Sequence, residues 1–98
     1  LMPPDLEKKG LSDVLSKLIQ KLNLANSTHF ELDTQALQTL TLSPRMAFDL
    51  YAICLELINN ILKHAAASQA IIRFTHEGFN LKLLISDNGK GMDGSSVN

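Results

Sequence analysis

The apolar positions of the chain follow two periods, one typical of helices and one typical of strands. An early apolar stretch recurs at helical spacing, so we expect a helix over residues 12–23, with Ser12 as its N-cap. A second helix should begin at Pro44, directly after the capping residue Ser43, because proline suits the first helical position. Its helical pattern continues to about Ala66.

Three stretches alternate between apolar and polar residues with the period of two that is typical of strands. We expect strands over residues 29–34, 69–77 and 80–87, whereas residues 35–42 are ambiguous. Gly78 permits a tight turn, so the last two strands should be antiparallel. The helical crossover between the first two should make them parallel. The predicted fold class is therefore α/β, a two-layer α+β sandwich in which helices cover one face of a mixed sheet.

The two ends of the sequence fit neither period. Residues 1–10 contain Pro3 and Pro4, followed by a charged cluster, and we interpret them as an irregular linker from a preceding region. Residues 93–98 form a polar tail that we expect to be disordered. The remaining length suits one small domain, which we place at residues 11–98.

Composition and charge exclude several classes of protein. Hydrophobic residues make up 45% and charged residues 19%, which is typical of a globular domain. The net charge of -1, without a basic patch, argues against nucleic acid as a partner. The single cysteine, Cys54, excludes an internal disulfide and a cysteine-based zinc cluster, and it fits a reducing cytoplasm. No apolar run reaches the roughly 18 residues of a membrane span, so we expect no membrane contact.

The second predicted helix carries a polar face opposite a wide apolar stripe. Glu56, Asn60 and Lys63 fall within about 60° of one another, so they can act on one ligand. The apolar arc consists of Ala47, Leu50, Tyr51, Cys54, Leu57, Ile58, Ile61 and Leu62. This arc should pack on the sheet. The alternative is that the polar residues form an ordinary solvated face with weak surface contacts.

A carboxylate ends the last predicted strand. The alternation that places Leu81, Leu83 and Ile85 on one face also places Asp87 there, so this acid should point toward the helices. Burying an unpaired carboxylate is costly. The pattern therefore fits two roles for Asp87, a ligand-binding carboxylate or an acid at the strand end that points into solvent.

The two polar segments together resemble the GHKL (Bergerat-fold) ATPases, which include sensor histidine kinases, DNA gyrase and a large heat-shock chaperone. Glu56-Leu-Ile-Asn-Asn60 is similar to the N box, and Asp87-Asn-Gly89-Lys-Gly91 is similar to the first glycine box. The resemblance is closer to the ATP-binding domain of histidine kinases related to the nitrate sensors. Residues 1–11 are similar to the segment before that domain, and residues 59–65 to its main helix.

The resemblance implies a role for each polar residue of this helix and for the strand-end acid. Asp87 would accept a hydrogen bond from the adenine amino group, and Asn60 would ligate Mg²⁺ through its amide oxygen. Lys63 would lie near the phosphates as a point charge. Glu56 would be the catalytic residue that polarises a water or the acceptor group. His64 would either line the same pocket or flank it structurally.

The resemblance also implies a role for the glycines of the glycine box and an activity for the parent enzyme. Gly89 and Gly91 would let the backbone approach the nucleotide. ATP and Mg²⁺ would be the cofactors of a cytoplasmic or membrane-anchored parent that transfers the γ-phosphoryl group to a histidine of a phosphoacceptor domain and then to a response regulator. The chain ends before the lid and the second glycine box of the family, so the isolated chain should have no kinase activity.

Two other hypotheses and one consequence of truncation remain open. The chain could be a non-catalytic interaction or dimerisation module. It could also be a relative of the anti-sigma-factor serine kinases, but the leucine- and proline-containing segment at its start argues against this second hypothesis. In a truncated domain the strand over residues 80–87 has an unpaired edge, with Lys82 as its only charged residue before Asp87. Such an edge recruits other chains, so we expect a homodimer.

Overall fold

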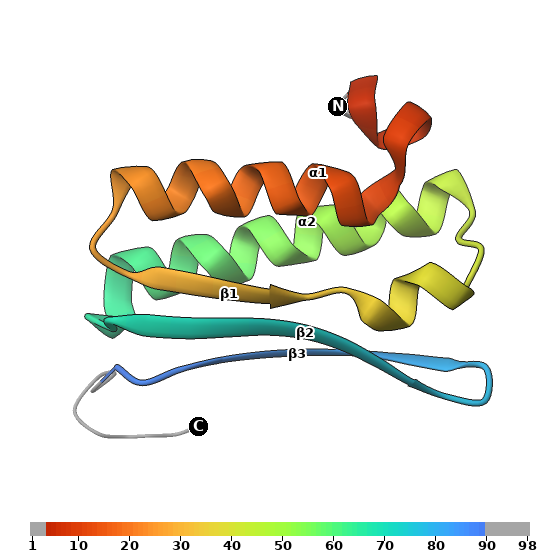
Figure 1. Ribbon diagram of the computed structural model, residues 1–98. Coiled ribbons are helices and arrows are strands. Elements are labelled where there is room, and N and C mark those ends of the chain that lie inside the picture. The colour runs from red at the N-terminus through yellow and green to blue at the C-terminus, as the bar shows by residue number, and fades with distance from the viewer. Residues whose placement is uncertain (1–3, 90–98) are drawn as a thin grey trace.

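A computed structural model describes residues 4–89, which form two layers, with helices packed on one face of a sheet (Figure 1). The elements in chain order are α1 (Pro4–Ala25), β1 (His29–Asp33), the 3₁₀ helix η1 (Gln35–Thr39), α2 (Pro44–Asn60), the π-helix η2 (Ile61–Ala65), β2 (Gln69–Glu77) and β3 (Asn80–Asp87). The predicted α/β class is confirmed. Gly91 and the predicted disordered tail lie outside the described residues.

The sheet has the order β1-β2-β3 and is mixed. β1 and β2 are parallel, with His29 opposite Gln69, and β2 and β3 are antiparallel, with Glu77 opposite Asn80. Gly78 forms the turn between them with a φ of 60°, a conformation that glycine adopts without steric cost. Both predicted strand pairings and the predicted bounds of β2 and β3 are confirmed, and the ambiguous stretch before α2 contains η1.

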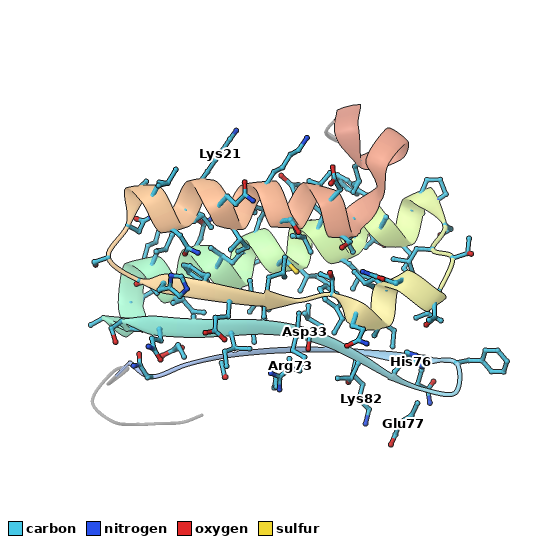
Figure 2. All side chains as sticks on the ribbon, in the orientation of Figure 1. Lys21, Asp33, Arg73, His76, Glu77 and Lys82 are labelled. Carbon is cyan, nitrogen blue, oxygen red and sulfur yellow. The ribbon has the colours of Figure 1, made fainter. Side chains whose placement is uncertain are left out.

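The face of the sheet that the helices leave uncovered carries two ion pairs (Figure 2). Arg73 Nε lies 3.4 Å from Asp33 Oδ2, which joins β2 to β1. Lys82 Nζ lies 3.5 Å from Glu77 Oε1, which joins β3 to β2. All four side chains are substantially exposed, and such pairs contribute little to stability.

α1 begins earlier than the sequence pattern predicted. It starts at Pro4, where the missing proline N–H falls in the first turn and breaks no helical hydrogen bond. Gly10, with φ 87° and ψ 168°, interrupts the helix, and Leu6 before it is only 3% exposed. The predicted irregular structure is therefore wrong from Pro4 onward, because the burial of Leu6 in the core holds this segment against the domain. Ser12 is not an N-cap, and its hydroxyl lies 2.7 Å from Thr34 Oγ1.

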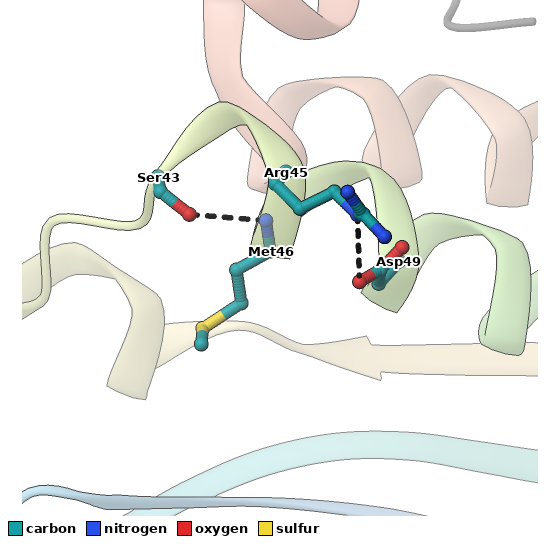
Figure 3. Close-up of polar contacts among 4 residues, drawn as sticks. All are labelled: Ser43, Arg45, Met46 and Asp49. Atoms are coloured by element: carbon teal, nitrogen blue, oxygen red, sulfur yellow. Dashed lines mark hydrogen bonds and ion pairs between the residues drawn. The ribbon is translucent and has the colours of Figure 1, made fainter.

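The start of α2 is the one that the sequence predicted. The backbone N–H of Met46 donates to Ser43 Oγ over 3.1 Å, which satisfies one of the free donors of the first turn (Figure 3). In the same first turns of the helix, Arg45 Nε lies 3.5 Å from Oδ2 of Asp49, which follows it by one turn. Pro44 occupies the start of the helix as expected.

The end of α2 is wider than an ordinary helix. After Asn60 the chain continues as the π-helix η2 and then stops at Ala66, which has the left-handed values φ 50° and ψ 40°. The predicted helical end near Ala66 is confirmed. The π-helical geometry was not predicted, and such turns are frequent at functional sites.

The core lies between the helices and the inner face of the sheet. Its fully buried large side chains are Phe30, Phe74, Leu15, Ile58, Ile72 and Cys54. The predicted apolar stripe of α2 therefore faces the sheet, with one correction. Leu57 is 36% exposed, because it lies at the margin of the stripe where no described element covers it.

β3 lies at an edge of the sheet in the part of the chain that the structure describes. The inward side chains Leu81, Leu83 and Ile85 are only half-buried, and Leu84 on the other face is 51% exposed. This edge position is the premise of the expected homodimer, which itself stays a prediction. Over residues 4–89, no helix combines the length and apolar character needed to span a membrane.

The buried thiol of Cys54 should make the stability of the fold depend on alkaline pH. Burial raises the pKa of the Cys54 thiol from its ordinary 9.0 to about 11, because desolvation disfavours the thiolate. Above pH 9 the unfolded chain therefore binds fewer protons than the folded chain, and the free energy of unfolding falls as the pH rises toward 11. At about pH 10 the thiol should lower the stability by about 1.4 kcal/mol.

Urea unfolding of the wild type and of Cys54→Ala at about pH 8 and about pH 10 measures this term. All other titrating groups are common to both chains, so the wild type should lose more stability between the two pH values. An equal loss in both chains would contradict the prediction.

Candidate functional site

The C-terminal end of α2, the start of β2 and the end of β3 lie together at one end of the molecule (Figure 1). β2 follows η2 after a short turn, and antiparallel pairing places Asp87 opposite Ala70 near the start of β2. The glycine-containing loop after β3 therefore returns to the end of the helix that carries the predicted polar face.

Gly89 packs directly against the end of η2. A Cβ at this position would collide with the carbonyl oxygen of Ala65, and it would lie 2.8 Å from the Ala65 carbonyl carbon and 2.9 Å from Asp87 Oδ1. Only glycine fits there without a shift of the backbone. The close approach brings the segment that follows Asp87 onto the helix end.

The polar residues of the helix are all exposed at this end. Glu56 and Asn60 belong to α2, whereas Lys63 and His64 belong to the widened turn η2. Within residues 4–89, none of these four side chains makes a hydrogen bond or an ion pair. They are therefore available to a ligand, although a solvated surface has the same property.

Asp87 lies on the inner side of β3 but is exposed rather than buried. The alternation predicted for the strand is present, and its apolar members are half-buried. The predicted inward face is therefore confirmed by the pairing of Asp87 with the buried Ala70, and of the two interpretations of this acid the structure shows the exposed one, at the end of the edge strand of the described sheet. One carboxylate oxygen, Asp87 Oδ1, accepts a hydrogen bond from the Gly89 N–H over 2.7 Å. The carboxylate keeps acceptor capacity for another donor.

Asn88 is a site residue that the sequence did not reveal. Its Oδ1 accepts from the backbone N–H groups of Ser68 and Gln69, each over 3.0 Å, and its Nδ2 donates to Ser68 Oγ over 3.0 Å. Its own N–H donates to the Gln69 carbonyl over 3.1 Å. The Asn-Gly pair signals only a turn. The partners of Asn88 lie about 20 positions away in the chain, which no local pattern discloses.

The donor set at this end suits a cation that is shared with a ligand. No cluster of three or more His, Cys, Asp or Glu side chains that could enclose a metal occurs among residues 4–89. Asn60 offers a single exposed amide oxygen, a hard ligand. Mg²⁺ commonly binds through one or two protein oxygens and completes its shell with waters and phosphate oxygens. The residues present therefore fit Mg²⁺ bound together with a phosphate ligand.

Comparison with known proteins finds sensor histidine kinases, and no protein-family model matches the chain. The chain is 30% identical over 91 residues to the sensor histidine kinase LiaS of Bacillus subtilis, a match that covers 93% of this chain and 24% of LiaS. It is 29% identical over 94 residues to the sensor histidine kinase MctS of Rhizobium johnstonii, covering 96% of this chain and 20% of MctS.

A third relative is the signal transduction histidine-protein kinase/phosphatase UhpB of Salmonella typhimurium, which is 30% identical over 93 residues, or 94% of this chain and 18% of UhpB. The chain therefore spans about a quarter or less of the length of the curated relatives that it matches. Matches along nearly the whole chain support its relationship to a domain of sensor histidine kinases.

Substitution of Gly89 should disturb this end of the molecule. Gly89→Ala places a methyl group against the Ala65 carbonyl, so we expect a loss of about 1–3 kcal/mol in unfolding free energy and a displaced loop. Urea unfolding measures the first effect, and amide NMR shifts of Ala65 and Asp87 measure the second. Ser86→Ala, an exposed change near the end of β3, is the control and should leave the stability and the Ala65 shift unchanged. Wild-type stability and wild-type shifts in Gly89→Ala would contradict the proposed contact.

Proposed function

We propose that this chain forms the first part of the ATP-binding domain of a sensor histidine kinase, with the GHKL type of nucleotide site. The observation that carries the proposal is the contact of Gly89 with the end of η2, which brings Asp87 close to the helix that bears Asn60. The similarity to four sensor histidine kinases supports it. The parent protein would transfer the γ-phosphoryl group of ATP to a histidine of a separate domain and on to a response regulator.

Asp87 is the residue that would select adenine. Its carboxylate is exposed and held by the Gly89 N–H, so its remaining acceptor capacity has a defined direction. A carboxylate can only accept hydrogen bonds. It therefore pairs with the amino group of adenine and rejects the oxo group that guanine presents at the same position.

The helix end would hold the phosphates. Asn60 supplies an amide oxygen for Mg²⁺, and Lys63 supplies a positive charge. The bound Mg²⁺ would neutralise charge that develops on the phosphates during transfer. Glu56 lies one turn before Asn60 on the exposed side and would polarise the acceptor group. His64 would line the pocket beside Lys63.

Asp87→Asn should abolish the preference for adenine. An amide can present either its oxygen or its NH₂ group, so it accepts from adenine or donates to guanine equally well. NMR titration of this chain with adenosine and with guanosine measures the ratio of the two affinities. We expect the wild type to prefer adenosine by about tenfold or more and the variant to lose this preference.

The matched control is Asp49→Asn, which removes an exposed carboxylate near the other end of α2, where it pairs with Arg45. This variant should keep the wild-type ratio. If Asp87→Asn also kept it, Asp87 would not read the base and the proposed site would be wrong.

Asn60→Ala should remove Mg²⁺-dependent phosphoryl transfer without unfolding the domain, because the side chain is exposed and makes no described contact. In a longer kinase that contains this segment, autophosphorylation should fall by at least about a hundredfold, as expected for the loss of a positioned metal. Asn59→Ala is the control, since this neighbour is exposed but points about 100° away around the helix. An unchanged Mg²⁺ requirement in Asn60→Ala would show that another group ligates the metal.

A further inference from the structure

We propose that Asn88 is a positioning residue that sets the spacing between the adenine side and the phosphate side of the nucleotide site, an inference that rests on the proposed function. Asn88 lies between Asp87, which would read the base, and Gly89, which packs on η2. Its side chain is bonded to the turn that follows Lys63 and His64. It therefore joins the two parts of the site.

The side chain of Asn88 is almost fully used by this connection. Both acceptor positions of Oδ1 are taken by the N–H groups of Ser68 and Gln69, and one Nδ2 hydrogen goes to Ser68 Oγ. The opposite orientation of the amide would direct NH₂ at two N–H donors, so the bonds themselves fix the orientation. With its oxygen saturated, Asn88 has no acceptor left for a ligand and acts through its neighbours.

The turn that receives Asn88 is itself held firmly from the other side. Thr28 is only 6% exposed, and its hydroxyl donates to the Ala67 carbonyl over 2.7 Å. The His29 N–H donates to the Ser68 carbonyl over 2.9 Å. β1 therefore anchors the turn, and the bonds from Asn88 anchor the end of β3 to that fixed point.

The position of Asp87 relative to η2 depends on this anchor. Among the described residues β3 has a partner strand on one side only. Asp87, at the end of β3, is therefore paired with β2 but has no strand on its other side to restrain it. Without the Asn88 side chain, the backbone bond from Asn88 to Gln69 and the Gly89 contact alone would hold the loop. Asp87 would then sample several directions, and its discrimination between adenine and guanine would weaken.

Three substitutions separate positioning from mere stability. Asn88→Ala removes all three side-chain bonds, and Ser68→Ala removes only one. Asn88→Asp keeps both acceptor positions and can receive the Ser68 hydroxyl proton, so it should restore the connection. Loss of folded protein alone would reduce the apparent affinity for every nucleoside by the same factor. The ratio of adenosine to guanosine affinity is therefore the decisive quantity.

The experiment titrates the 98-residue chain with adenosine and with guanosine by NMR, and it records amide hydrogen exchange at Ser68 and Gln69. Asn88→Ala should lower the adenosine-to-guanosine ratio by about tenfold and accelerate exchange at both amides. Asn88→Asp should keep the ratio within about twofold of wild type, and Ser68→Ala should fall between the two.

The outcomes distinguish this inference from the proposed function. If Asn88→Ala exchanges faster at both amides but keeps the wild-type ratio, Asn88 does not position the base-reading group, although the nucleotide site stands. If the wild type shows no preference for adenosine and Asp87→Asn changes nothing, the proposed function fails and the inference fails with it. Should Asn88→Ala not fold, a wild-type ratio in Ser68→Ala with faster exchange at Ser68 would still overturn the inference.

Discussion

The packing of α2 against the sheet is the constraint on which the rest of the structure depends. Ile58 on the helix and Ile72 on β2 are both fully buried in one core. Burying each large apolar side chain stabilises the fold by about 1.5–3 kcal/mol. Because a helix turns only one stripe toward a sheet, this packing directs Glu56 and Asn60 outward. The exposed polar face of the helix end is thus a consequence of the core.

The short turn between η2 and β2 is the second feature that holds the structure together. Two segments bond to it, because Thr28 and His29 reach it from the start of β1 and Asn88 reaches it from just after β3. Of these bonds the one from Thr28 to the Ala67 carbonyl is buried, where an unpaired polar group would be costly. Directional hydrogen bonds therefore order this end of the molecule in addition to the core.

The similarity to sensor histidine kinases and the geometry of this end support one another. The similarity concerns the whole chain, whereas the geometry concerns the candidate site. The matches extend along nearly the whole chain and relate it to a domain of these proteins. The geometry shows which residues lie together, with Gly89 against Ala65 and Asp87 bonded to Gly89. The assignment of adenine to Asp87 and of Mg²⁺ to Asn60 is a chemical proposal built on both.

The sequence by itself determined the features that depend on near neighbours. The bounds of β2 and β3 follow from alternation around Gly78, and the start of α2 follows from Ser43 and its proline. Tertiary structure alone decided the features that depend on distant partners. The early start of α1 requires a core that receives Leu6, and the bonds of Asn88 require a turn about 20 residues away. Periodicity and capping act within about four residues along the chain, whereas burial and long-range hydrogen bonds exist only once the layers have assembled.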